Sequence, residues 1–190
     1  IMIVQRDGII VAVDADNLLI TSRSPKKIRG YSRIAGFQRM FEWISTYGRI
    51  LRVDFYLSPE QCVYKDCLWG DIWRRYKDAF HVSFYNCPQK ISSEGDLETT
   101  EDNVDEHLVY NTREAVNFFA NRVKYLCLAS GDVDYSKFLW ELKQKRSIET
   151  MFVIGSEPSF SRVYRKVGLV AADPFNSKKE LVYRFSPNKK

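Results

Sequence analysis

The sequence predicts one α/β domain, a three-layer α/β/α sandwich with a central, mainly parallel β-sheet. Short, continuous apolar runs at residues 9–13, 125–129 and 151–154 are typical of strands that helices cover on both faces. Helical patterns lie between these runs, and an alternation of strands and helices leads to parallel strands joined by crossovers. The 190 residues suit a single domain with a full hydrophobic core.

Two further segments complete the expected sheet. Residues 50–57 alternate apolar and polar side chains, which predicts a strand with one wetter face, and residues 80–85 form a weaker candidate. The polar segments 21–33 and 89–101 are expected to be loops. Apolar residues at helical spacing predict helices near residues 34–44, 69–76, 104–119, 138–142 and 160–167.

Composition limits the classes of protein to which the chain can belong. Hydrophobic residues make up 45% and charged residues 28%, which excludes a disordered chain. No apolar run is long enough to span a membrane, so no membrane association is expected. The net charge of +5 and the basic tail at 186–190 are compatible with a polyanionic partner. Four cysteines without a C-x-x-C pair argue against structural zinc and indicate reduced thiols in a cytoplasmic protein.

Carboxylates follow directly after two of the most apolar strands. Asp14 and Asn17 come after the first strand, and Asp132 and Asp134 come after the strand at 125–129. Open parallel sheets bind ligands outside the carboxyl ends of their strands, near the topological switch point. If the two strands are neighbours, we expect Asp14 and Asp132 to share one crevice, with Asn17 and Asp134 close by.

Such a cluster predicts a bound cation. Two carboxylates about 4 Å apart repel by about 4 kcal/mol at an effective dielectric constant of about 20. Because these motifs offer no cysteine or histidine ligand, the expected ion is a hard cation with oxygen ligands, Mg²⁺ or Mn²⁺. Such an ion would clamp a phosphate and generate a hydroxide nucleophile.

Each of these residues also has a structural interpretation. Asp14 can be a turn residue, Asn17 can cap the segment after the first strand, and Asp134 can cap the helix that begins at Tyr135. The acidic segment 101–106 can complement the dipole of the helix that it begins. Two acid-bearing strand ends in one chain nevertheless favour a functional site.

Four motifs in this chain resemble those of the NYN domain family, a LabA-like branch of the PIN-like metal-dependent nucleases. They occur in the family's order and cover residues 9–175. The motifs are D-x-x-N at residues 14–17, the second half of K-G-V-D at 104–105, S-G-D-V-D-Y at 130–135 where the family has S-G-D-S-D-F, and A-D-x-F at 172–175.

The resemblance implies a PIN-like fold, a metal-dependent nuclease and a catalytic centre with bound Mg²⁺ or Mn²⁺. It also assigns roles to individual side chains by their place in the motifs. The implied metal-binding acids are Asp14, Asp105, Asp132 and Asp134, the supporting residues of the centre are Asn17 and Ser130, and the implied structural residue at the sheet edge is Asp173.

The chain departs from the family around the third acid. Asp102 and Asn103 replace the family's Lys-Gly, and Asn111 stands where the family often has a second aspartate. An amide can supply an oxygen ligand in support but no charge. Metal affinity is therefore expected to be lower unless Asp102 or Glu106 compensates. These departures leave open a protein that binds RNA but cuts it poorly.

The leading hypothesis is a metal-dependent nuclease that hydrolyses phosphodiester bonds, with single-stranded RNA as the expected partner and a 5′-phosphate on the product. A homodimer, and additional domains in a longer chain, are both left open. Basic side chains would add salt-dependent contacts with the nucleic-acid backbone. The candidates for these contacts are Lys26, Lys27, Arg29 and Arg33.

Two alternatives remain. One is a catalytically weak or inactive NYN-type module that binds RNA or another protein. The other is a phosphatase similar to the haloacid dehalogenases, because Asp14 and Asp16 match that family's D-x-D, with Asp14 as covalent nucleophile. The later acid that such a phosphatase needs is missing, since Ser136 and Lys137 stand in its place.

Overall fold

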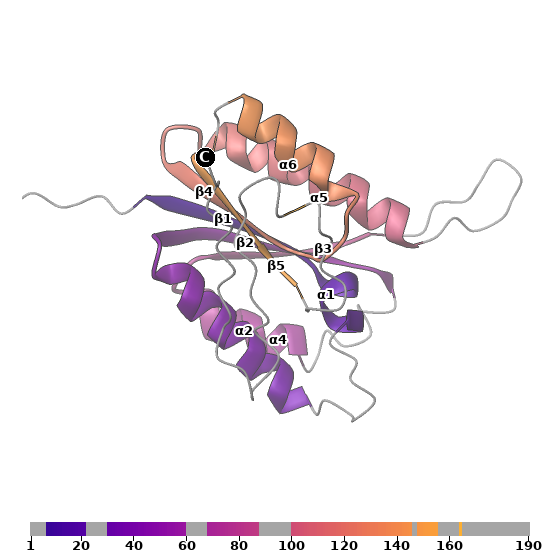
Figure 1. Cartoon of the computed structure of the whole chain (residues 1–190). Coiled ribbons are helices and arrows are strands. Elements are labelled where there is room, and N and C mark those ends of the chain that lie inside the picture. The colour runs from indigo at the N-terminus through magenta and orange to yellow at the C-terminus, as the bar shows by residue number, and fades with distance from the viewer. Residues whose placement is uncertain are drawn as a thin grey trace, which may run out of the picture.

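The computed structural model describes residues 7–21, 30–59, 68–87, 100–145, 148–155 and 164. Within helices, it leaves undescribed the side chains of residues 20, 21, 30–32 and 100–102. The described residues form three layers, with a β-sheet between two layers of helices (Figure 1). This confirms the predicted α/β sandwich.

All strand pairs in the described sheet are parallel. The spatial order is β3-β2-β1-β4-β5, so the chain builds outward from β1 in one direction and then in the other. The topological switch point therefore lies between β1 and β4, and the two acid-bearing strands are neighbours as predicted. The strands are β1 (Gly8–Asp14), β2 (Arg49–Leu57), β3 (His81–Asn86), β4 (Val123–Ala129) and β5 (Thr150–Ile154).

Helices cover both faces of the sheet. In Figure 1, α5 and α6 lie on one face, and α1, α2 and α4 lie on the other. Alternate side chains of β1 pack against the two helical layers. Val11 packs in the core beneath α2, and Ala12 packs beneath α5 and α6. The helices are α1 (Ala15–Thr21), α2 (Gly30–Ser45), α4 (Gly70–Tyr76), α5 (Thr100–Phe118) and α6 (Tyr135–Gln144).

Aromatic rings fill the core beneath α2 and α4. Phe55 of β2 lies 5.5 Å from Phe37, 5.4 Å from Trp69 and 5.0 Å from Phe84, measured between ring centroids. Side chains from two helices and two strands therefore meet at one ring. This packing fixes β2 and β3 against the helical layer opposite to α5 and α6.

Two segments predicted as loops are shorter than expected. α2 begins at Gly30 and α5 begins at Thr100, so each helix starts inside a segment with a polar, loop-like composition. The short helix α1 was not predicted at all. Seven residues span only about two turns, which is too short for a clear helical period.

The expectation of a wetter face on β2 is wrong. Asp54 is 1% exposed and Tyr56 is fully buried, because α5 covers this face of the sheet. Arg52 Nε lies 2.8 Å and 2.7 Å from the two carboxylate oxygens of Asp54, and Arg52 also donates to the Tyr85 hydroxyl. The polar residues of this strand therefore form a buried ion pair instead of a solvated surface.

Several predictions lie outside the described residues. They are most of the helix at 160–167, the A-D-x-F motif with Asp173, the basic tail at 186–190, and the side chains of Lys26, Lys27 and Arg29. The organisation of the whole chain as one domain also stays a prediction. In the described ranges, we find no helix with the length and apolar character needed to cross a membrane.

Candidate active site

The ends of β1 and β4 are joined by hydrogen bonds between their two motifs. Ser130 Oγ donates to Asp14 Oδ2 at 3.0 Å, and the Gly131 backbone N–H donates to Asn17 Oδ1 at 2.9 Å. Asp14 Oδ1 also accepts a bond of 3.0 Å from the Asn17 backbone N–H, which caps α1. Asp14 is thus both a capping residue and the centre of the cluster, and Asn17 and Ser130 hold the two strand ends together.

Tyr135 connects the third acid to this cluster. Its hydroxyl lies 3.2 Å from Asp14 Oδ2 and also contacts Asp105 Oδ1 of α5. The side chain is 1% exposed and begins α6. A hydroxyl has one hydrogen, so it can donate to only one of the two carboxylates at a time. Sequence reasoning did not assign Tyr135 a role, although it stands where the family motif has phenylalanine.

Asp132 and Asp134 occupy the turn between β4 and α6. Asp132 Oδ1 accepts a bond of 3.0 Å from the Asp134 backbone N–H, and the Asp132 backbone N–H donates to Ser130 Oγ at 3.2 Å. Asp134 is at the N-cap of α6, yet its side chain makes no capping hydrogen bond. The capping interpretation of Asp134 is therefore wrong, and its carboxylate is exposed beside Tyr135.

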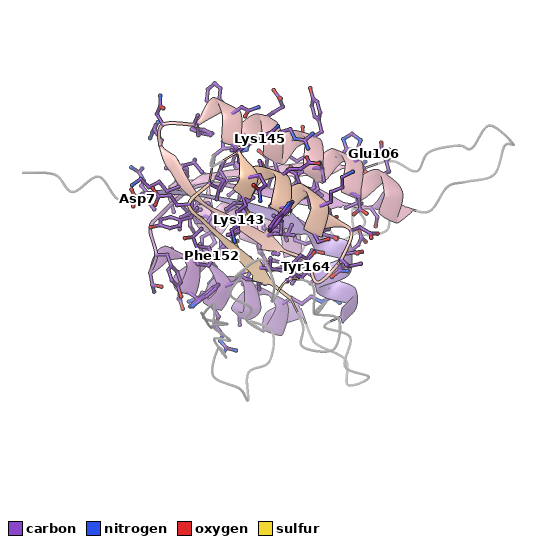
Figure 2. All side chains as sticks on the ribbon, turned by 45° about the horizontal axis from the view of Figure 1, so that its top comes forward. Asp7, Glu106, Lys143, Lys145, Phe152 and Tyr164 are labelled. Carbon is purple, nitrogen blue, oxygen red and sulfur yellow. The ribbon has the colours of Figure 1, made fainter. Side chains whose placement is uncertain are left out.

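A second tyrosine is influenced by all four acids. Tyr164 is fully buried (labelled in Figure 2), and burial raises the pKa of its hydroxyl above the ordinary range. The charges of Asp132, Asp134, Asp105 and Asp14 raise this pKa further, in that order. All four predicted acids therefore lie near enough to Tyr164 for their charges to act on its hydroxyl. Sequence analysis missed Tyr164 because it lies in a segment without a recognised motif.

The charge of Asp14 is poorly compensated. The residue is 4% exposed, and burial raises the pKa of its carboxyl group to about 7, against the lowering effects of the hydrogen bonds from Asn17 and Ser130. The nearby charges of Asp105 and Asp16 raise it further. Among the described residues, the ion pairs do not include Asp14. A cation bound from solution would stabilise the ionised form of Asp14 and so lower this pKa.

The donor chemistry of the cluster fits Mg²⁺ or Mn²⁺, because the side chains that would hold the ion offer only carboxylate oxygens. These side chains are Asp14, Asp105, Asp132 and Asp134. In the part of the chain that the structure describes, no three potential ligands are yet close enough to enclose an ion. The Tyr135 hydroxyl contacts both Asp14 and Asp105, so it occupies carboxylate oxygens that these two residues would offer to an ion.

The remaining candidates lie at different distances from the cluster. Asn111 is partly buried on α5, about 9 Å along the helix axis from Asp105. Glu106 is exposed on the same helix, next to Asp105. Arg33 is in the first turn of α2, in the layer opposite to α5 and α6. The roles of Arg33 and Asn111 stay predictions.

Asp16 is near enough for its charge to act on Asp14, but both of its carboxylate oxygens are engaged by Ser58. Its two carboxylate oxygens accept bonds from the Ser58 backbone N–H at 2.9 Å and the Ser58 hydroxyl at 2.6 Å. These bonds tie the start of α1 to the end of β2. The D-x-D interpretation needs Asp16 as a general acid, and this contact gives that interpretation no support.

Comparison with known proteins decides the family. A sequence profile of the NYN domain matches residues 8–168, which is most of the chain. The chain belongs to the NYN domain family. The NYN domain indicates a PIN-like nuclease family, in agreement with the three motifs that lie within the matched residues, at 14–17, 104–105 and 130–135.

A solved structure supports the fold independently. The crystal structure of a protein of unknown function from Vibrio parahaemolyticus RIMD 2210633 is similar to this chain with a TM-score of 0.58. The sequences are 17% identical, and the match covers 92% of this chain and 98% of the other. At this identity the similarity concerns the fold alone. No curated protein matches the NYN-family chain significantly.

Proposed function

We propose that this NYN domain is a Mg²⁺- or Mn²⁺-dependent ribonuclease. The observation that carries the proposal is the buried, uncompensated Asp14 at the topological switch point, with Asp105 joined to it through Tyr135. Asp132 and Asp134 lie on the adjacent turn. We also propose a cytoplasmic location, because Cys87 and Cys127 are buried thiols that form no disulfide.

The four acids and their supporting side chains would have different roles in this reaction. Asp14 and Asp105 would provide the inner carboxylates, while Asp132 and Asp134 would face the entering phosphodiester from the solvent side. Ser130 and Asn17 would keep the two strand ends in register through their bonds to Asp14 and Gly131. When bound, the divalent cation would neutralise the phosphodiester and supply the hydrolytic nucleophile.

Cleavage of end-labelled, single-stranded RNA tests this proposal. The assay compares Mn²⁺, Mg²⁺ and EDTA, with the wild type, Asp132→Asn and the control Asp78→Asn, which alters an exposed acid in the turn after α4. We expect metal-dependent cleavage that Asp132→Asn abolishes and Asp78→Asn leaves intact. Cleavage that survives Asp132→Asn, or that persists in EDTA, would contradict the proposal.

A second candidate function is a weakly active or inactive RNA-binding module. The contact of the Tyr135 hydroxyl with both Asp14 and Asp105 favours it, because this hydroxyl occupies carboxylate oxygens that would otherwise hold a cation. A folded wild type that retains RNA in a gel shift, but neither binds Mn²⁺ nor cuts in its presence, would establish this alternative.

A further inference from the structure

A groove of about 600 Å³ opens beside the acid cluster, between α5 and the start of α6. Its volume is in the range of pockets that hold a small organic ligand such as a nucleotide. Glu106, labelled in Figure 2, marks its position on α5. The lining residues are Asp105, Glu106, His107, Val109, Tyr110, Arg113, Asp134 and Tyr135.

The groove follows the axis of α5 away from the acids. Asp105 and Asp134 lie at one end, and Tyr110 and Arg113 follow along the helix. At 1.5 Å per residue, Tyr110 lies about 7.5 Å and Arg113 about 12 Å beyond Asp105 in the axial direction. An acidic end, an aromatic ring and a guanidinium group therefore occur in sequence along one wall.

Tyr110 presents an aromatic ring to solvent. The residue is 65% exposed. Of the large hydrophobic side chains that are exposed in the described ranges, it is the one that lines this groove. Single-stranded nucleic acids bind to such rings because every base has a π-face that can stack, without a requirement for sequence. Bases inside a duplex are already stacked on one another and cannot use the ring in this way.

Arg113 is held in a defined position at the other end of the groove. Its Nη2 donates to Glu141 Oε2 at 2.9 Å, and its guanidinium carbon lies 5.6 Å from the centre of the Phe138 ring. A guanidinium has five N–H donors, so the bond to Glu141 leaves others for an anion. The group is partly exposed and faces the groove.

We propose that this groove is a nucleotide subsite for single-stranded nucleic acid. The nucleotide next to the scissile phosphodiester stacks its base on Tyr110, and the following phosphate contacts Arg113. This inference rests on the proposed nuclease function, and it adds which side chains hold the nucleotide next to the scissile bond. Because Asp105, Glu106 and Asp134 repel phosphates, binding in the groove needs a divalent cation at the acidic end.

Fluorescence anisotropy of a labelled RNA of about 12 nucleotides tests the subsite. The assay uses Ca²⁺ as the cation and the whole chain, with the same RNA annealed to its complement as competitor. Tyr110→Ala is expected to weaken binding about tenfold, whereas Tyr110→Phe, which keeps the ring, binds as the wild type does. Phe118→Ala is the matched control, because Phe118 is 81% exposed at the far end of the same helix.

Arg113→Met gives a separate readout. We expect weaker binding and a shallower dependence of affinity on salt, because one phosphate contact is lost. Glu141→Gln removes the ion-pair partner without removing the guanidinium, and is expected to leave the salt dependence unchanged.

The outcomes separate this inference from the function on which it rests. Unchanged binding by Tyr110→Ala, equal losses in Tyr110→Ala and Phe118→Ala, or equal affinity for duplex and single strand would overturn the subsite, even if the wild type cuts RNA. Ring-dependent binding by a wild type that never cuts would support the subsite and reject the nuclease. No binding of RNA by the wild type in Ca²⁺ would also overturn the subsite.

Discussion

Two buried aspartates on neighbouring strands have opposite electrostatic environments. Asp54 is paired with Arg52, which reaches both of its carboxylate oxygens, whereas Asp14 receives bonds only from neutral groups in the described hydrogen bonds. Burial raises the pKa of both carboxyl groups. The hydrogen bond and charge of Arg52 oppose this rise at Asp54, but the charges of Asp105 and Asp16 add to it at Asp14.

This electrostatic difference distinguishes a carboxylate with a structural role, Asp54, from one that can bind a ligand, Asp14. Asp54 has its counter-ion on the same strand, and Arg52 also donates to the Tyr85 hydroxyl of β3. Asp14 lies at the switch point of the sheet, where ligands bind, and the charges of Asp105 and Asp16 act on it. The comparison therefore predicts that loss of the counter-ion of Asp54 lowers the stability of the fold. Loss of the Asp14 charge is expected to be tolerated.

The largest expected effect comes from breaking the internal pair. Arg52→Met leaves Asp54 buried without a cation and should lower the free energy of unfolding by about 3 kcal/mol at neutral pH. Urea denaturation measures this. Arg74→Met is the control, because Arg74 pairs with Asp71 on the exposed surface of α4 and should cost no more than about 1 kcal/mol. Similar losses in the two variants would contradict the buried role of Arg52.

The next effect concerns pH. Because the pKa of Asp14 is raised to about 7, the folded protein binds more protons than the unfolded chain between about pH 4 and pH 7. In EDTA, the contribution of Asp14 therefore makes the free energy of unfolding fall as pH rises through this window, by at most about 1.4 kcal/mol per pH unit. Asp14→Asn should flatten that part of the profile, as measured by urea denaturation. Parallel profiles would show that Asp14 does not titrate in this range.

A smaller effect is expected at the hydroxyl that contacts the two acids. Tyr135→Phe should lower the stability of the metal-free protein by about 1 kcal/mol and tighten Mn²⁺ binding about fivefold, since the ion no longer competes with the hydroxyl. Electron paramagnetic resonance of free Mn²⁺ measures the affinity. Tyr125→Phe, far from the site, is the matched control and should leave it unchanged. Weaker Mn²⁺ binding by Tyr135→Phe would mean that the hydroxyl supports the ion instead.

The smallest effect on stability is expected at Asp134. Its side chain makes no capping bond, so Asp134→Ala should change the free energy of unfolding by no more than about 0.5 kcal/mol. A capping aspartate would cost about 1 kcal/mol. The same variant should lose metal-dependent RNA cleavage. Normal cleavage by Asp134→Ala would remove this residue from the proposed centre.

The position of the acids could be predicted from the sequence, because strand ends and sheet topology determine it. Asp14 and Asp132 each follow a continuous apolar run, and such runs indicate strands covered on both faces. The assumption that the two strands are neighbours then brings the acids to one edge, and the structure confirms that β1 pairs with β4. Local pattern was sufficient here because Asp14 is the last residue of β1 and Asp132 comes shortly after the end of β4.

The contacts between distant side chains could not be predicted in this way. The bonds of Tyr135 to Asp14 and Asp105 depend on how α6 is placed over α5, and no local pattern encodes that placement. The alternation in β2 indicated a solvated face, although α5 covers it and Arg52 neutralises Asp54. In both cases, tertiary packing decides the environment of a polar residue.

The central claim is that the Asp14 cluster binds a divalent cation from solution, because no ion pair of the described residues includes Asp14. Its most direct test is a Mn²⁺ titration, followed by electron paramagnetic resonance, of the wild type, Asp14→Asn and Asp54→Asn. We predict that the wild type binds Mn²⁺, that Asp14→Asn binds at least about tenfold more weakly, and that folded Asp54→Asn binds as the wild type does. Equal Mn²⁺ affinity in Asp14→Asn and the wild type, or no binding by the wild type, would contradict the claim.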